Sequence, residues 1–311
     1  MQVLIIGGNG VLGNALKAHF NRHGIQYKVA KACASIEPRT IGDTPTYNLY
    51  KGEIEGLDYS NLSRKKIAIL LAGISNPTQA HSDKRNSYNI NFIGTIKILE
   101  KLEQFGYWTF FVSSIEVFPG QKIDYKETDN PEPLNWYGQL KFRVEEFIVS
   151  QLESCTILRT GWNIPTAQHR TGRDPVEVTY RSLLSSNPRM AIDNYFTPIS
   201  AEDFAIALTL IVQSEICDAR IIHIASSEIY SRSEFADLIL ASSRNVDLNR
   251  YDKVFHHDFY SGKSEPRGRI NGLSNKLLTA LSPMTFTAIE NIVTNRIRQL
   301  DEIYRREGLH G

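Results

Sequence analysis

Short apolar segments alternate with longer amphipathic segments along the first half of the chain. Continuous apolar runs such as Ile67–Leu71 are typical of parallel strands that are buried on both faces. Between these runs, apolar residues recur every three or four positions, as they do in amphipathic helices. The pattern predicts strands at Val3–Ile6, Tyr27–Ala30, Ile67–Ala72, Thr109–Ser113 and Cys155–Leu158, and helices at Asn14–His23, Asn86–Gln104 and Tyr137–Gln151.

This alternation predicts an α/β fold of the Rossmann type, with a doubly wound parallel sheet covered by crossover helices. After residue 160 the pattern loosens, and prolines and glycines interrupt it. A helix at Ala201–Gln213 and an apolar run at Arg220–Ala225 then read as one more helix and strand of the sheet. We therefore expect residues 1–160 and about 197–226 to form the sheet domain. A smaller, discontinuous second region would comprise about 161–196 and 227–311.

The C-terminal segment carries its apolar residues on one helical stripe. Such a stripe is more often a core-packing face than a partner site, so we expect it to be buried against the rest of the chain. The stripe consists of Phe286, Ile289, Ile292, Val293, Ile297, Leu300 and Ile303.

Composition and charge give no sign of a protein that binds nucleic acid or acidic membranes, or that relies on disulfides. A formal net charge of +1 over 311 residues gives no reason to expect a nucleic acid or an acidic membrane as partner. The cysteines Cys33, Cys155 and Cys217 form no CxxC pair, which favours a reducing compartment such as the cytoplasm. No signal peptide or membrane-spanning pattern is recognisable, and the sequence leaves a homodimer open.

Three glycines follow the first predicted strand at GxxGxxG spacing. Gly7, Gly10 and Gly13 lie in IIGGNGVLGNAL, where a strand runs directly into a helix. Glycines allow a tight turn and a close backbone approach, and the helix N-terminus offers free amides to a pyrophosphate. The segment predicts a dinucleotide site in the first domain, with Val11 and Leu12 beside the glycines.

The end of the second predicted strand bears on the choice of dinucleotide. A binder of the free ribose 2′-hydroxyl usually has a carboxylate there, whereas this chain has Ala30 and Lys31. A lysine suits a 2′-phosphate, so NADP(H) is favoured and NAD(H) is the alternative. A solvated Lys31 at the strand end is the competing interpretation.

Tyr137, Lys141 and Ser114 are the candidate catalytic residues. Tyr137 and Lys141 are four positions apart, which places both on one face of a helix. Ser114 follows the predicted strand Thr109–Ser113 and is in a position to bind the same substrate oxygen. A lysine ammonium beside a phenol would lower the phenol pKa, so we expect Tyr137 to exchange a proton near neutral pH.

These motifs resemble the extended short-chain dehydrogenase/reductase superfamily, and most of all its dTDP-4-dehydrorhamnose reductase family. The resemblance spans nearly the whole chain. Its further elements are matched by Ala72 and Gly73; Asn91, Gly94 and Thr95; Val117, Phe118 and Gly120; Tyr125 and Glu127; Pro133, Asn135 and Gly138; and Arg159, Thr160 and Trp162.

The resemblance implies which residues bind each ligand. For the cofactor it adds Leu71, Ala72, Gly73 and Asn91 to the glycine turn, together with Tyr137 and Lys141. For the substrate it implies Ser114, Glu116, Trp162 and Arg267, with Arg269 as a looser match to the residue near a nucleotide diphosphate.

Two positions depart from the family pattern. Ile115 stands where the family usually has an aspartate, and Gly161 stands where it usually has a serine. The related dehydratases carry an aspartate and a glutamate directly after their active threonine, and only Glu116 of that pair is present here. Dehydration is therefore disfavoured, and whether Glu116 faces the substrate or solvent stays open.

The resemblance implies an enzyme that reduces a 4-keto group on a nucleotide-activated deoxysugar, with NAD(P)H as the hydride donor. The alternatives are a nucleotide-sugar epimerase or dehydratase that uses the same residues, and a non-catalytic NAD(P)-binding regulatory subunit. No metal site is expected, because His256, His257 and Asp258 are adjacent rather than at metal-ligand spacing.

Overall fold

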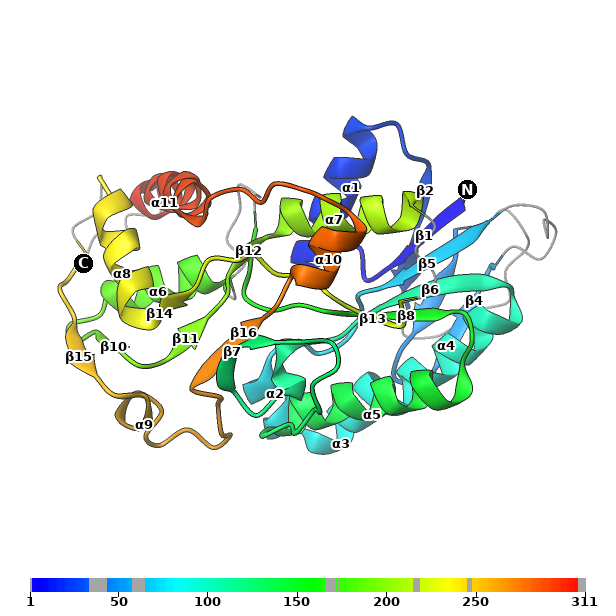
Figure 1. Ribbon diagram of the computed structural model, residues 1–311, viewed down its shortest axis with the longest axis horizontal. Coiled ribbons are helices and arrows are strands. Elements are labelled where there is room, and N and C mark those ends of the chain that lie inside the picture. Colours follow the sequence, from blue (N-terminus) through cyan, green and yellow to red (C-terminus); the bar gives the residue numbers. More distant parts are fainter. Residues whose placement is uncertain are drawn as a thin grey trace.

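A large, mostly parallel sheet forms the centre of the computed structural model, which describes residues 2–33, 44–57, 65–165, 172, 174–214, 219–244 and 248–306. In this part of the chain the strand order is β13-β8-β6-β5-β1-β2-β3-β4, and only β4 runs antiparallel to its neighbour (Figure 1). The predicted Rossmann-type α/β fold is confirmed. The strands are β1 (Gln2–Ile6), β2 (Tyr27–Ala32), β3 (Thr46–Asn48), β4 (Glu53–Glu55), β5 (Lys66–Leu70), β6 (Tyr107–Val112), β8 (Cys155–Arg159) and β13 (Ile221–His223).

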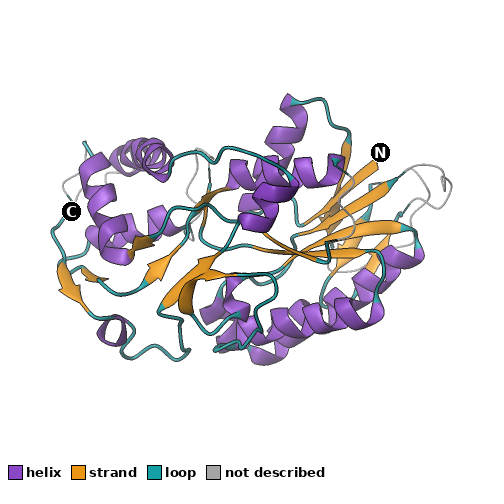
Figure 2. Ribbon diagram, viewed as in Figure 1, coloured by secondary structure: helices purple, strands orange, loops and turns teal. Residues whose placement is uncertain are grey.

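Helices cover both faces of this sheet (Figure 2). Successive residues of a strand point to opposite faces, so β1 sends Val3 and Ile5 into one core and Leu4 and Ile6 into another. Burial on both faces explains why the strands are continuous apolar runs. The first core is closed by α1 (Val11–Arg22) and α7 (Ala201–Gln213), and the second by α4 (Thr95–Gln104) and α5 (Trp136–Gln151).

The helix predicted over Asn86–Gln104 is divided into three parts. These are α3 (Lys84–Tyr88), the π-helical turn η1 (Asn89–Gly94) and α4. The chain packs closely at Gly94, where any side chain would overlap the carbonyl of Leu49. The apolar period does not reveal a π turn, because one wider turn hardly disturbs the apolar stripe.

A second, smaller set of strands and helices lies beside the large sheet. Its four-stranded sheet has the order β14-β11-β16-β7, and two further strand pairs are β10 with β15 and β12 with β9. Its strands are β7 (Gln121–Tyr125), β9 (Asn163–Ile164), β10 (Arg189–Ala191), β11 (Tyr195–Phe196), β12 (Ile199–Ser200), β14 (Tyr230–Ser231), β15 (Asp252–Val254) and β16 (Ile270–Leu273). The remaining helices are α2 (Pro77–Ser82), η2 (Ile115–Val117), α6 (Pro175–Leu183), α8 (Arg232–Ser242), α9 (His256–Phe259), α10 (Lys276–Leu281) and α11 (Ile289–Arg306).

The predicted C-terminal stripe belongs to α11, and its role as a packing face is confirmed. Ile289, Ile297 and Leu300 are fully buried in a core shared with α6 and α8. Phe286 lies before the helix begins and packs against the core of the large sheet instead.

The domain boundaries inferred from the sequence stay a prediction. As expected, α7 and β13 join the large sheet, although they follow the loop-rich segment. The strand β7, from within residues 1–160, pairs instead with β16 of the smaller sheet.

Cys33 and Cys155 are free thiols, whereas Cys217 lies outside the described residues. No helix of the described ranges has the length and apolar character needed to cross a bilayer.

Candidate active site

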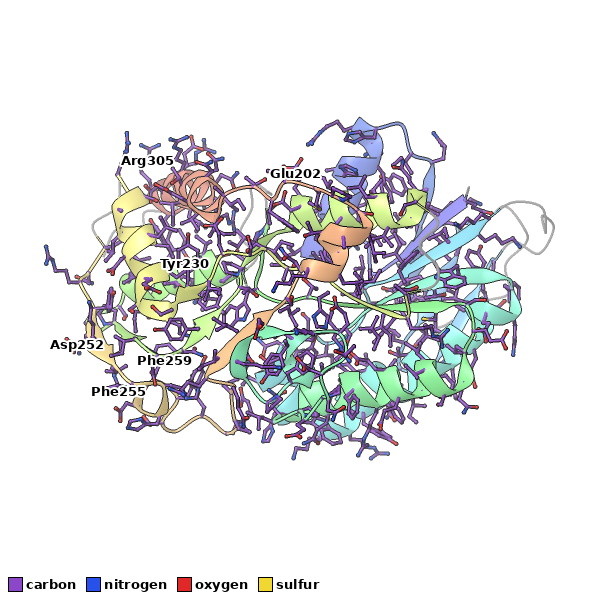
Figure 3. All side chains as sticks on the ribbon, in the orientation of Figure 1. Glu202, Tyr230, Asp252, Phe255, Phe259 and Arg305 are labelled. Carbon is purple, nitrogen blue, oxygen red and sulfur yellow. The ribbon has the colours of Figure 1, made fainter. Side chains whose placement is uncertain are left out.

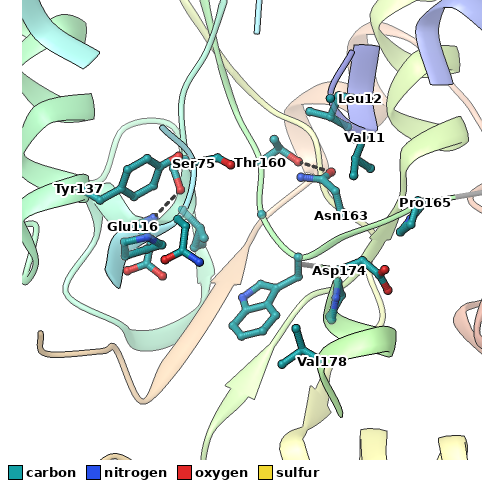
Figure 4. Close-up of a pocket in the computed structure, with 18 of the residues that line it drawn as sticks. Val11, Leu12, Ser75, Glu116, Tyr137, Thr160, Asn163, Pro165, Asp174 and Val178 are labelled. Atoms are coloured by element: carbon teal, nitrogen blue, oxygen red, sulfur yellow. Dashed lines mark hydrogen bonds between the residues drawn. The ribbon is translucent and has the colours of Figure 1, made fainter. Parts of the chain in front are cut away.

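A cleft of about 1440 Å³ opens where the large sheet meets the smaller one. Its walls include the residues that directly follow β1, β6 and β8, so it lies at the carboxyl ends of the parallel strands, where α/β sheets usually bind ligands. In Figure 4, Tyr137 and Glu116 stand on one side and Asp174 and Val178 of the α6 region on the other.

Most of the residues predicted for the cofactor and the substrate line this one cleft. Lys31, Ala72 and Asn91 are not among the lining residues. Those that line it are Gly7, Gly10, Val11, Leu12, Gly13, Leu71, Gly73, Ser114, Glu116, Tyr137, Lys141, Trp162 and Arg267.

The three glycines of the turn have different physical reasons to be glycine. Gly7 has a φ of +93°, and a Cβ there would lie 2.5 Å from the amide nitrogen of Ala72. A Cβ on Gly13 would lie 2.6 Å from the Cα of Gly8, so this glycine lets the helix pack on the turn. Gly10 is exposed and has open space around its Cβ position, with one atom 3.8 Å away. A side chain at Gly10 would therefore occupy the cleft rather than the fold.

The N-terminus of α1 is free to bind an anion. Gly10 is its N-cap and supplies no side-chain acceptor, and the first turn has no acidic residue. By contrast, α5, α6, α7 and α8 all begin with a side chain that accepts a hydrogen bond from the first turn. The uncapped amides of α1 at the cleft are what a dinucleotide pyrophosphate requires, so the turn fits this group.

Asn91 acts on the cleft indirectly. Its amide group exchanges two hydrogen bonds with the backbone of Ile74, both of 2.8 Å. Gly73, at a φ of +149°, has its Cβ position 3.0 Å from the Asn91 oxygen. Asn91 therefore fixes the wall segment from Gly73 to Ile74.

Tyr137 and Ser114 both line the cleft and form a side-chain hydrogen bond with each other. Burial raises the pKa of Tyr137 to about 12; a hydrogen bond with Ser114 opposes this shift, and the carboxylate of Glu116 adds to it. The expectation that Lys141 lowers the pKa of Tyr137 is wrong for this structure. The physical reason is that removal of the phenol from water disfavours phenolate, so Tyr137 is a proton donor at neutral pH.

Lys141 lies one helical turn after Tyr137 on α5, and its side chain is only 9 % exposed. Its ammonium donates a hydrogen bond of 2.8 Å to the carbonyl of Val112 and lies 4.6 Å from the centre of the Phe111 ring. Burial lowers the pKa of Lys141 to about 8, although the nearby Glu145 carboxylate favours the charged form. Lys141 is thus held at the strand end, under the surface of the cleft.

A buried polar network lies behind the catalytic residues. Glu145, one helical turn beyond Lys141, accepts the Ser113 hydroxyl and pairs with Arg159 through bonds of 2.6 to 3.1 Å. Arg159 in turn contacts His223 at 3.4 Å, and burial and the Arg159 charge lower the His223 pKa to about 3. This network ties α5 to the ends of β6, β8 and β13.

Glu116 points neither freely into solvent nor freely at a substrate. One of its oxygens accepts a hydrogen bond of 2.6 Å from Asn135, the N-cap of α5, and the other lies 3.7 Å from Arg267. Arg267 also donates 3.0 Å to Glu265, a buried carboxylate that accepts the Thr78 hydroxyl as well. Burial alone would raise the pKa of Glu265, but these hydrogen bonds and the Arg267 charge lower it to about 2. The charge of Arg267 is therefore largely neutralised within the protein.

The two departures from the family pattern contact each other. Ile115 and Gly161 both line the cleft, and a Cβ on Gly161 would lie 2.5 Å from Cγ2 of Ile115. The larger side chain at one position thus requires the glycine at the other, and together they form an apolar part of the wall beside Ser114.

Trp162 lines the cleft in an unusual backbone conformation, with a φ of +55°. A non-glycine residue in the left-handed region costs about 1–3 kcal/mol and persists only where its surroundings hold it. Phe196 packs on the indole at 4.3 Å, and the guanidinium of Arg232 lies 4.7 Å from its ring centre.

Arg232 is a cleft residue that the sequence analysis missed. The Ser231–Glu234 capping box predicts the start of α8 but carries no signal about which surface its first residue faces.

Among the described residues, no group of three or more His, Cys, Asp or Glu is arranged to hold a metal ion.

The family model described as "RmlD substrate binding domain" matches residues 1–267. The chain is 22% identical over 248 residues to methionine adenosyltransferase 2 subunit beta from Bos taurus, covering 76% of this chain and 70% of that protein. Over 154 residues, covering 48% of this chain and 46% of the relative, it is 25% identical to a UDP-glucose 4-epimerase from Lacticaseibacillus casei.

Two solved structures have closely similar folds. One is dTDP-4-dehydrorhamnose reductase from Bacillus anthracis in complex with NADP, with a TM-score of 0.73, 21% identity, and 97% and 99% of the two chains covered. The other is UDP-glucose 4-epimerase from Thermus thermophilus in complex with NAD, with a TM-score of 0.72, 16% identity, and 96% and 98% covered. At this identity the two structures establish the fold.

Proposed function

The chain belongs to the RmlD substrate binding domain family, and we propose that it reduces the 4-keto group of a nucleotide-activated deoxysugar with NADPH or NADH. The observation that carries the proposal is the meeting of Ser114, Tyr137 and Lys141 in the cleft that the glycine turn also lines. One cleft thus combines a proton donor with a turn suited to a dinucleotide.

The chemistry divides between the cofactor and the chain. The nicotinamide, when bound, supplies the hydride to the ketone carbon. Tyr137, kept neutral by its high pKa, donates its proton to the ketone oxygen, and the hydroxyl of Ser114 orients that oxygen. The product is an alcohol, and Tyr137 is left as a phenolate that must regain a proton. Lys141, whose ammonium is held at the strand end by the Val112 carbonyl, would hold the nicotinamide ribose.

Replacing Tyr137 with phenylalanine tests the proposal. The variant lacks the donated proton but keeps the ring, so we expect NADPH oxidation with 4-keto-6-deoxy nucleotide sugars to fall by roughly 100-fold or more. Cofactor affinity should stay close to that of the wild type. Tyr50→Phe is the matched control, because Tyr50 is 51% exposed and does not line the cleft. Near-normal turnover of the Tyr137 variant would refute the catalytic assignment.

Two alternatives use the same cleft. An epimerase would convert a nucleotide sugar without a net supply of reduced cofactor, so incubation with oxidised cofactor alone distinguishes it from a reductase. A non-catalytic subunit, as suggested by the relative named methionine adenosyltransferase 2 subunit beta, would bind cofactor and turn over no nucleotide sugar. The intact catalytic set favours a reductase over that subunit, and a dehydratase is disfavoured because Glu116 is held by Asn135 and Arg267.

For the cofactor we propose a preference for NADP(H), with NAD(H) as the weaker ligand. Lys31 is exposed near the end of β2 and does not line the cleft, and β2 carries no carboxylate that would repel a 2′-phosphate. An exposed contact of this kind contributes about 1 kcal/mol, or several-fold in affinity. Titration of both cofactors into wild type and Lys31→Asp measures this. A wild type that prefers NADH would contradict it.

A further inference from the structure

Arg232 is surrounded by aromatic rings on the cleft wall. Its guanidinium carbon lies 4.7 Å from the ring centre of Trp162, 5.2 Å from Phe259, 5.7 Å from Tyr260 and 5.9 Å from Phe196. The rings come from three segments, since Phe259 and Tyr260 are adjacent, and Phe259, labelled in Figure 3, ends the short helix α9. Packing of this kind holds a guanidinium plane in one orientation.

Hydrogen bonds orient Arg232 further without neutralising it. Its Nε donates 2.6 Å to the side-chain oxygen of Asn194, and Nη2 donates 2.7 Å to the hydroxyl of Tyr260. Asn194 is itself buried and fixed by bonds to the carbonyls of Gly268 and Arg269. Both acceptors on Arg232 are neutral, and no carboxylate of the described residues forms an ion pair with it.

The other arginines near this end of the cleft differ in charge balance. Arg267 is paired with Glu265 and lies 3.7 Å from Glu116. Arg269 is 55% exposed, pairs with Asp193 and does not line the cleft. Arg232 thus presents an oriented positive charge with unused N–H donors to the cleft. The exposed side chains of Lys263 and Arg189 line the cleft as well.

We propose that Arg232 binds the diphosphate of the substrate, and that Arg267 instead holds the protein segments of the cleft together. The proposal rests on the proposed function, because it takes a nucleotide sugar as the ligand. A guanidinium offers two parallel donors that match phosphate oxygens, and a charge left unneutralised in a cleft attracts a polyanion. Trp162, stacked on Arg232, places the sugar end of that ligand beside the diphosphate.

The experiment measures binding rather than turnover, with the NADPH-saturated protein. Calorimetry with UDP, dTDP, GDP, CDP and ADP identifies the nucleoside diphosphate that binds the wild type. Arg232→Met should weaken that binding by about 10- to 100-fold, as expected for loss of a charge-assisted bond, and leave NADPH affinity unchanged. Arg232→Lys keeps the charge but not the planar fork, so its affinity for the nucleoside diphosphate should lie between those of the wild type and Arg232→Met.

Controls separate loss of the contact from loss of the fold. Arg269→Met removes a nearby arginine that does not line the cleft and should bind like the wild type. The matching nucleoside, which lacks phosphate, should bind the wild type and Arg232→Met equally well. Arg232→Met should also bind inorganic pyrophosphate more weakly, by a factor similar to that for the nucleoside diphosphate. If Arg232 instead binds a carboxylate of the sugar, the substitution would leave pyrophosphate binding unchanged.

Three results would overturn the proposal. Arg232→Met could bind the nucleoside diphosphate as well as the wild type does, or it could lose affinity equally for the nucleoside and the nucleoside diphosphate. The third is that the wild type binds no nucleoside diphosphate. Failure of the proposed function has a different signature. In that case nucleoside diphosphate binding still depends on Arg232, but no ketosugar is reduced.

Discussion

Lys141 should destabilise the fold at neutral pH, because its charge is buried. The test substitution is Lys141→Met, which keeps the length of the side chain and removes the charge. Burial lowers the pKa of Lys141 from the ordinary 10.5 to about 8, so the folded protein holds this proton less tightly than the unfolded chain does.

The magnitude follows from this difference in pKa. Between pH 8 and 10.5 the unfolded chain binds more protons than the folded protein, so stability rises with pH over this interval. Below pH 8 the whole penalty is present, and at 1.36 kcal/mol per pH unit it amounts to about 3 kcal/mol. Methionine also loses the hydrogen bond to the Val112 carbonyl, worth about 1 kcal/mol. We therefore expect Lys141→Met to be about 2 kcal/mol more stable than the wild type at pH 7.

Urea unfolding at pH 7 and pH 10 measures this difference, and NADPH oxidation measures activity. The stability advantage of Lys141→Met should shrink toward pH 10, where most of the wild-type lysine is neutral, and the variant should be severely impaired in catalysis. The matched control is Lys51→Met, since Lys51 is an exposed lysine outside the cleft. Its stability relative to the wild type should not change over this pH range.

The reasoning is refuted if Lys141→Met is less stable than the wild type at pH 7. It is also refuted if the difference in unfolding free energy is the same at both pH values. Either result would mean that the folded protein solvates or neutralises the ammonium well enough to remove the penalty.

Three further predictions concern the glycine turn, the cleft wall beside Ser114 and the buried network behind it. Gly10→Val should abolish NADP binding in calorimetry, while its melting temperature stays near that of the wild type. Gly13→Val should lower stability by about 1–3 kcal/mol or more, because its side chain meets backbone. Equal melting temperatures for the two variants would contradict this prediction. Gly161→Ser should cost about 1–3 kcal/mol in urea unfolding, and Ile115→Ala should recover part of it; strictly additive effects would show that the two positions do not interact. Arg159→Met should cost about 3–5 kcal/mol, since its buried carboxylate partner loses its counter-charge, and a loss below about 1 kcal/mol would speak against this.

The amino-acid sequence was enough to predict the longer strands of the large sheet and the position of the glycine turn. Both depend on local features: continuous apolar runs for buried parallel strands, and glycines where β1 passes into α1. The spacing of Tyr137 and Lys141 belongs to the same kind of information, because four positions make one turn of α5. Short strands such as β3 and β10, of three residues each, were not predicted, since so few residues carry no recognisable period.

Properties that depend on residues distant in the sequence became visible only in the folded structure. The pKa values of Tyr137 and Lys141 shift in the direction set by burial, and burial depends on what the rest of the chain packs around them. The contact of Ile115 with Gly161 joins the ends of two neighbouring strands, and Arg232 lines the cleft only because the smaller sheet lies beside the larger one. Local spacing states which residues share a strand or a helix face. Charge balance and side-chain fit depend instead on the sum of all neighbours, which exist only once the chain has folded.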